Sequence, residues 1–154
     1  MTSAYQHIQT LAQLQAIKND LDGDYVLDND IDATDTATWN WDEVLGEYQG
    51  FEPIGNESTP FTGIFKGSGY IISNLFINRP TTDYVGLFGV TNGGAIHRIG
   101  LENVTTIGYD YVGPLIGLAG YPDVSTIICF CYATGSAFGN KYVGGLIGGD
   151  GIPP

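Results

Sequence analysis

Three stretches of the chain repeat one motif: Tyr84-Val-Gly-Leu-Phe-Gly89, Tyr111-Val-Gly-Pro-Leu-Ile-Gly117 and Tyr142-Val-Gly-Gly-Leu-Ile-Gly148. We call it the Tyr-Val-Gly motif. Its valines, at positions 85, 112 and 143, lie 27 and then 31 residues apart. Repeats of this length are typical of architectures in which each unit buries its apolar face against the next. Such a repeat predicts a scaffold or a binding surface more readily than a single catalytic pocket.

The segments between the motifs are short apolar strands that end in glycine turns, with no crossover helix between them. This pattern predicts an all-β chain, a parallel β-solenoid whose equivalent side chains form ladders inside. The repeated glycines are expected at corners that need positive φ or close backbone approach. The units superpose as Ile72, Leu75 and Ile77 on Ile96, Ile99 and Leu101, and on Ile128, Cys131 and Ala133 with a one-residue slip. The predicted core ladder residues are Val85, Val112, Val143, Leu87 and Leu115.

The first segment has a different pattern. Thr10 can cap a helix over residues 11–21, in which apolar residues recur at helical spacing, and Gly23 follows its end. A helix ahead of a repeat array is expected to cap the first unit. We therefore predict one domain over residues 1–154. Its parts are a capping helix within 8–23, lead-in rungs at 24–69, repeats at 70–148 and a tail at 149–154.

Composition excludes several partners. The chain has 5 Lys plus Arg against 17 Asp plus Glu, a net charge of −12, which disfavours nucleic acid. No apolar run approaches the roughly 20 residues that span a bilayer, so membrane insertion is not expected. No signal peptide is visible at the N-terminus. Cys129 and Cys131 are predicted to be free thiols on one face of a strand, because i and i+2 are too far apart for an unstrained disulfide.

The chain resembles the GLUG-repeat family of bacterial surface and secreted proteins, which includes filamentous-haemagglutinin-like adhesins. The resemblance rests on Tyr142-Val-Gly-Gly-Leu-Ile-Gly148 preceded by Cys131-Tyr-Ala-Thr-Gly135, and on a lead-in that includes Pro53-Ile-Gly55 and Phe61-Thr-Gly-Ile-Phe65. It covers roughly residues 8 to 148. It implies a right-handed parallel β-helix that is secreted or on a cell surface, and it implies no activity.

Catalysis and cofactors have little support in the sequence. Carboxylates are scattered, no nucleophile, zinc or phosphate-loop motif is present, and we predict neither an enzyme nor a cofactor. One metal alternative remains open, a calcium site at Asp20, Asp22 and Asp24. Asp-Leu-Asp-Gly-Asp resembles the start of a calcium loop, although Ile31 stands where such a loop needs glutamate.

Two other functions remain as alternatives to a structural scaffold. The first is a carbohydrate-binding module that recognises surface glycans through Trp39 and Trp41, which share a face if that segment is extended. The second is a fragment of a polysaccharide-degrading enzyme.

The last motif is followed by no helix or polar capping unit. An open solenoid end exposes unpaired strand edges, which can pair with another chain. We therefore expect a structural scaffold whose final rung contacts either neighbouring repeats of a longer chain or a second copy, head to tail, as in a filament. The predicted contact residues are Cys129, Phe130, Cys131, Leu146 and Ile147.

Overall fold

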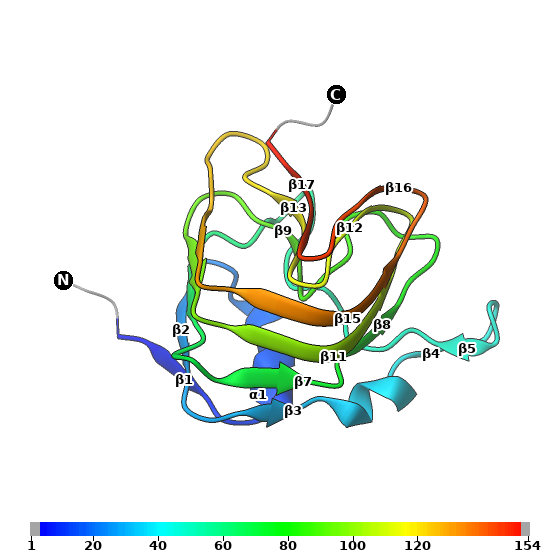
Figure 1. Ribbon diagram of the computed structural model, residues 1–154, viewed down its shortest axis with the longest axis horizontal. Coiled ribbons are helices and arrows are strands. Elements are labelled where there is room, and N and C mark those ends of the chain that lie inside the picture. The colour runs from blue at the N-terminus through cyan, green and yellow to red at the C-terminus, as the bar shows by residue number, and fades with distance from the viewer. Residues whose placement is uncertain (1–3, 152–154) are drawn as a thin grey trace.

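The computed structural model describes residues 4–151, so the last three residues of the predicted tail lie outside the described range. The described chain is all-β apart from one short α-helix and two 3₁₀ turns. Strands from successive turns of the chain stack above one another in parallel sheets (Figure 1). We call each such turn a rung and number them from the N-terminus.

Four rungs are defined by their strands. Rung 1 holds β2 (Asp24–Leu27) and β3 (Ile31–Asp32). Rung 2 holds β6 (Ile64–Lys66), β7 (Ile71–Ser73), β8 (Phe76–Asn78) and β9 (Phe88–Val90). Rung 3 holds β10 (Ala95–His97), β11 (Gly100–Ile107), β12 (Asp110–Val112) and β13 (Ile116–Ala119). Rung 4 holds β14 (Ile127–Cys129), β15 (Tyr132–Phe138), β16 (Lys141–Val143) and β17 (Ile147–Asp150).

Each side of the stack is one parallel sheet. The first runs β1-β2-β6-β10-β14, with β1 (Gln6–Ile8) at its N-terminal edge. The second runs β3-β7-β11-β15, the third β9-β13-β17, and β12 pairs with β16. Because every one of these pairings is parallel, each rung repeats the course of the rung before it.

The predicted superposition is right for the later units and wrong for the first. Ile96 pairs with Ile128 as predicted, but its partner in rung 2 is Phe65, and Ile72 pairs with Leu101. The reason is a longer corner in rung 2. Lys66 pairs with His97 and Ile71 with Gly100, so the corner between them has four residues in rung 2 and only two in rung 3.

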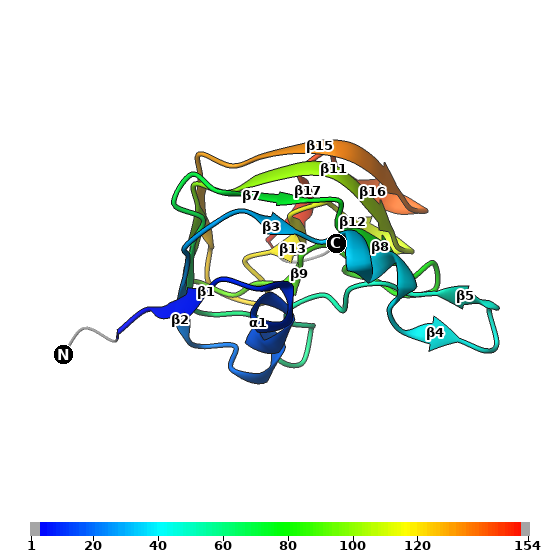
Figure 2. The ribbon, with the colours of Figure 1, turned by 90° about the horizontal axis from the view of Figure 1, so that it is seen from below.

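The N-terminal helix is present but shorter than predicted. Thr10 is its N-cap, and its hydroxyl and the Gln13 side chain form a reciprocal capping box. Helix α1 spans Leu11–Ala16 and passes into the 3₁₀ turn η1 (Ile17–Asn19), so it does not continue to residue 21. Leu14 and Ile17 are buried in the core. Figure 2 shows α1 across the end of the stack where rung 1 lies.

The Tyr-Val-Gly motif has a definite geometry at one corner. Tyr84, Tyr111 and Tyr142 take the left-handed backbone conformation, with φ of 61°, 59° and 55°. The glycines of the motif do not. All of them except Gly145 are required for close approach instead; a Cβ at Gly117, for example, would lie 2.6 Å from the carbonyl carbon of Tyr84. Of the two reasons expected for glycine here, close approach applies to these positions and positive φ applies to none of the motif.

Rung 1 contains an excursion before it rejoins the stack. After the 3₁₀ turn η2 (Thr34–Thr38), β4 (Trp41–Asp42) and β5 (Glu47–Tyr48) form an antiparallel hairpin that projects from the rungs (Figure 1). Its base is closed by hydrogen bonds. The Asn40 side chain donates to the Gly50 carbonyl at 2.7 Å, and the Gly50 amide donates to the Trp39 carbonyl at 3.0 Å. Ile54 then bridges Phe88 in rung 2.

Candidate functional site

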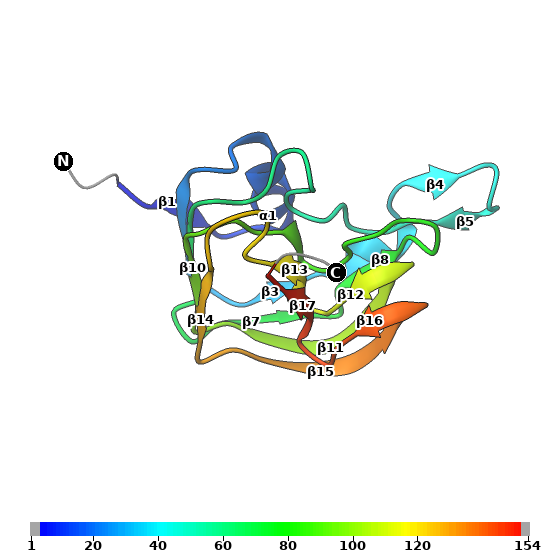
Figure 3. The ribbon, with the colours of Figure 1, turned by 90° about the horizontal axis from the view of Figure 1, so that it is seen from above.

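The candidate site is the outer face of rung 4, seen from above in Figure 3. Among residues 4–151, β14, β15 and β17 are the terminal strands of their sheets, and β16 pairs only with β12. Their outer backbone N–H and C=O groups therefore have no strand partner in the described chain. An edge of this kind is a template for another strand.

The apolar ladders that are buried in rungs 2 and 3 become partly exposed to solvent at this face. Val85 and Val112 bridge each other and are fully buried, and Val112 pairs with Val143, which is 43% exposed. Leu87 and Leu115 are also fully buried, as predicted. Leu146 and Ile147 are half-buried and pack against the core from one side. The ladder prediction is thus confirmed for rungs 2 and 3, and rung 4 presents the next layer with its outer side open.

The predicted contact residues Cys129, Phe130 and Cys131 do not lie on one face. Phe130 has φ 55°, so the chain turns a corner there and the strand geometry that would align the two thiols is interrupted. Cys129 is exposed and Cys131 is half-buried against the core, and both are free thiols. Burial raises the pKa of the Cys131 thiol. Phe130 is 77% exposed.

The three motif tyrosines form a column of rings along the stack. The centroids of Tyr84 and Tyr111 are 5.3 Å apart, and those of Tyr111 and Tyr142 are 4.5 Å apart with an interplanar angle of 16°. Burial raises the pKa of the Tyr84 phenol. Tyr142, at the end of the column, is 47% exposed, so the column reaches the open face.

Two of the three aspartates of the calcium alternative accept hydrogen bonds from other segments of the chain. The Asp20 carboxylate accepts from the Gln6 amide at 2.8 Å, which lowers its pKa, and Asp24 accepts from the Ile64 amide of rung 2 at 3.1 Å. Asp22 is exposed. Within residues 4–151 no group of three His, Cys, Asp or Glu side chains is placed to hold a metal ion. The geometry therefore gives the calcium alternative no ligand set.

The two tryptophans occupy different environments. Asn40, between them, has φ 56°, so the segment is not extended and the condition for a common face is not met. Trp39 packs against the core. Trp41 is 54% exposed on the hairpin and contacts the Tyr48 ring edge to face at 4.9 Å. A sugar platform made of both tryptophans is thus not formed.

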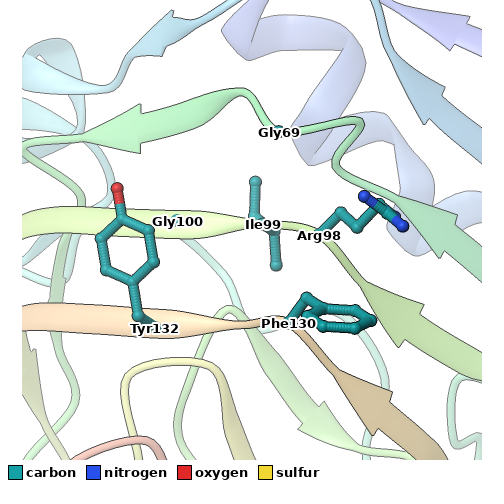
Figure 4. A pocket seen from close by; sticks show the side chains of 6 residues that line it. All are labelled: Gly69, Arg98, Ile99, Gly100, Phe130 and Tyr132. Carbon is teal, nitrogen blue, oxygen red and sulfur yellow. The ribbon is translucent and has the colours of Figure 1, made fainter.

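A pocket that the sequence patterns did not predict lies at the corner between β10 and β11, next to rung 4. Gly69, Arg98, Ile99, Gly100, Phe130 and Tyr132 line it (Figure 4). Arg98 and Phe130 are equivalent corner positions of rungs 3 and 4, since His97 pairs with Cys129 just before them. In the sequence, the available signal for this pocket was that two large side chains, Arg98 and Phe130, occupy equivalent positions of successive units.

Comparisons with known proteins relate the chain to larger proteins. No family model matches it. It is 41% identical over 145 residues to halomucin of Haloquadratum walsbyi, a match that covers 92% of this chain and 2% of halomucin. It is 36% identical over 96 residues to a candidate Gly-rich membrane protein of Evansella cellulosilytica, covering 59% of this chain and 10% of that protein. The chain thus spans a small part of the length of both relatives.

A solved structure shares the fold. It is a candidate immunoglobulin A1 protease from Bacteroides ovatus, with a TM-score of 0.60 and 16% identity, and the match covers 97% of this chain and 63% of that one. At this identity the likeness concerns the fold alone. None of the helices described here has the length and apolar character that crossing a membrane requires.

Proposed function

We propose that the chain is a structural segment of a secreted or cell-surface protein, a right-handed parallel β-helix of the GLUG-repeat kind without enzymatic activity. The parallel pairing of four rungs supports the architecture. The names of the relatives support the location, since one is halomucin and the other a candidate membrane protein. The net charge of −12 keeps such a surface soluble through self-repulsion.

The observation that carries the proposal is the open outer face of rung 4. Unpaired strand edges surround half-buried Leu146 and Ile147, and this arrangement accepts a further rung. The further rung comes from neighbouring repeats of a longer chain or from a second copy bound end to end. The small share of each relative that the chain covers supports the first source. Helix α1 lies across the rung 1 end of the stack. In an end-to-end assembly, the open rung 4 face of one copy therefore has to contact the rung 1 end of the next copy beside this helix.

Sedimentation over a wide concentration range, together with negative-stain microscopy, tests the self-association. We expect oligomers or fibres of the wild-type chain that are lost in Leu146→Asp, because a buried unpaired carboxylate at the contact is costly. Phe138→Asp is the matched control, since Phe138 belongs to the same rung and is 58% exposed. Uniform wild-type monomers at every concentration refute end-to-end assembly of this chain. Equal losses in both variants contradict a contact at Leu146.

A further inference from the structure

The corner pocket of Figure 4 has one wall made by a cation on an aromatic ring. Arg98 and Phe130 take left-handed conformations, with φ of 56° and 55°, and both side chains are exposed. The guanidinium carbon of Arg98 lies 5.1 Å from the centroid of the Phe130 ring. This cation–π contact holds the two side chains together at the mouth of the pocket.

The opposite wall is the ring of Tyr132. It lies against Gly100, where a Cβ would be only 2.5 Å from the ring. Its hydroxyl donates to the Glu102 carboxylate at 2.7 Å. The Tyr132 ring is thus held by its contact with Gly100 and by the hydrogen bond of its hydroxyl to Glu102. At the rim, a Cβ on Gly69 would meet nothing within 4 Å, so the space above the pocket is open.

The hollow between these walls has a volume of about 180 Å³. This is less than the roughly 300–1,000 Å³ of sites that enclose a drug-sized ligand, so the hollow suits one unit of a polymer and not a larger ligand. The hollow presents an exposed aromatic face on one side. At the Tyr132 end the phenol oxygen lines the hollow, and the Glu102 carboxylate, which is not itself a lining residue, accepts the phenol hydrogen bond; both oxygens can accept hydrogen bonds.

Arg98 gives the pocket a positive charge. Among residues 4–151, Lys18 forms a salt bridge with Glu52 and the His7 ring contacts Asp28, and Arg98 has no carboxylate partner there. The chain has only 5 Lys plus Arg against 17 Asp plus Glu. An unpaired guanidinium on so acidic a surface, beside a hollow, is complementary to a carboxylate, which it can bind through two parallel hydrogen bonds.

We propose that this pocket, the Arg98–Phe130–Tyr132 pocket, binds a pyranose sugar that carries a carboxylate, such as a uronate unit of an acidic polysaccharide. The carboxylate pairs with Arg98, the C–H face of the ring packs on Phe130, and sugar hydroxyls donate to Glu102 beside Tyr132. A neutral sugar leaves Arg98 unpaired. A triaspartate peptide carries carboxylates for Arg98 but offers no hydroxyl to Glu102. This binding goes beyond the scaffold function and does not require it.

Titration of the full chain with a galacturonate trimer, followed by amide NMR shifts, tests the proposal. Shifts are expected at residues 98–102 and 130–132, and the neutral galactose trimer should bind about tenfold more weakly because it lacks the charged pair. Arg98→Asn and Phe130→Asn should each weaken binding about tenfold. Asparagine is chosen because it tolerates the left-handed conformation of both positions.

Two controls come from the same rung. Lys141→Asn removes an exposed cation and Phe138→Asn an exposed aromatic ring, both away from the pocket, and each should change affinity less than about twofold. The titration is repeated in Leu146→Asp, so that loss of self-association and loss of sugar binding are separate results. Circular dichroism checks the fold of each variant.

Three results overturn the proposal. One is equal weakening by Lys141→Asn and Arg98→Asn, which means general attraction of an anion. Another is equal affinity for the neutral trimer or for a triaspartate peptide, which removes the need for a carboxylated sugar. The third is the absence of wild-type shifts around Arg98 and Phe130, which decides the matter even where a variant fails to fold.

Discussion

Gly117→Ala is the substitution for which the structure gives the most definite expectation. Gly117 is the last glycine of the second Tyr-Val-Gly motif and is buried. A Cβ there would lie 2.6 Å from the Tyr84 carbonyl carbon, 2.6 Å from the Val85 nitrogen and 2.8 Å from the Gly89 oxygen. Carbon contacts are normally about 3.5–4.0 Å, so each of these is short by about 1 Å.

The atoms in the way are backbone atoms of rung 2 that cannot move freely. The Val85 amide donates to the Tyr111 carbonyl at 3.0 Å, and the Gly89 amide donates to the Ile54 carbonyl at 2.9 Å. Overpacking of this kind costs about 1–3 kcal/mol, and a strained backbone hydrogen bond adds about 1 kcal/mol. We therefore expect the free energy of unfolding to fall by about 3 kcal/mol, which lowers Tm by about 6–12 °C in a domain of this size.

Gly145→Ala is the matched control, because a Cβ at Gly145 meets nothing within 4 Å and its φ lies outside the left-handed region. That variant should be unchanged or more stable by up to about 1 kcal/mol, through the lower entropy of its unfolded chain. Thermal unfolding followed by circular dichroism measures both. If Gly117→Ala melts within about 2 °C of Gly145→Ala, close backbone approach is not the reason for glycine in the motif.

Three further predictions concern single side chains. Burial, together with the positive charges of Lys66 and Arg98, lowers the pKa of His97 in the folded chain. As the pH falls below about 6.5, the His97 ring therefore takes up a proton more readily in the unfolded chain than in the folded one. The free energy of unfolding should fall as the pH drops from 7 toward 5, and urea titrations of His97→Gln should show a smaller fall. Iodoacetamide at pH 8 should label exposed Cys129 before Cys131, whose thiol pKa is raised by burial; peptide mass spectrometry showing equal rates would contradict this. Asn103 has φ 53° and donates to the Asn74 side chain at 2.8 Å, so Asn103→Ala should cost about 1–2 kcal/mol in urea unfolding and Asn103→Gly clearly less.

The sequence was sufficient for features that depend on local patterns. Thr10 was predicted to be the N-cap of the first helix, and the structure has it there. The valines at 85 and 112 were predicted to stack because the motif repeats, and they bridge each other. In both cases the residues that decide the geometry are near in sequence or repeat in it.

Other features depend on corner lengths and backbone conformations that cannot be predicted from a local sequence pattern. The alignment of the first unit failed because the corner after Lys66 is longer than the corner after His97. A common face for Trp39 and Trp41 failed because the backbone at Asn40 is left-handed. Left-handed corners at bulky residues are uncommon, and this is also why the pocket beside Arg98 was not foreseen.

The hairpin of rung 1 has a consequence for how such a protein can change over evolution. Asn40 and Gly50 close its base by hydrogen bonds, and the Gln49 carbonyl accepts from the Asn78 amide of rung 2, so this end of the hairpin is tied to the stack. The amides of the tip, residues 44–46, donate to Asp42 within the hairpin instead. The length and composition of the tip are therefore uncoupled from the register of the stack. This position can gain, lose or exchange residues while the neighbouring rungs stay as they are, so a long repetitive protein can vary what it displays at such points and keep one unchanged frame.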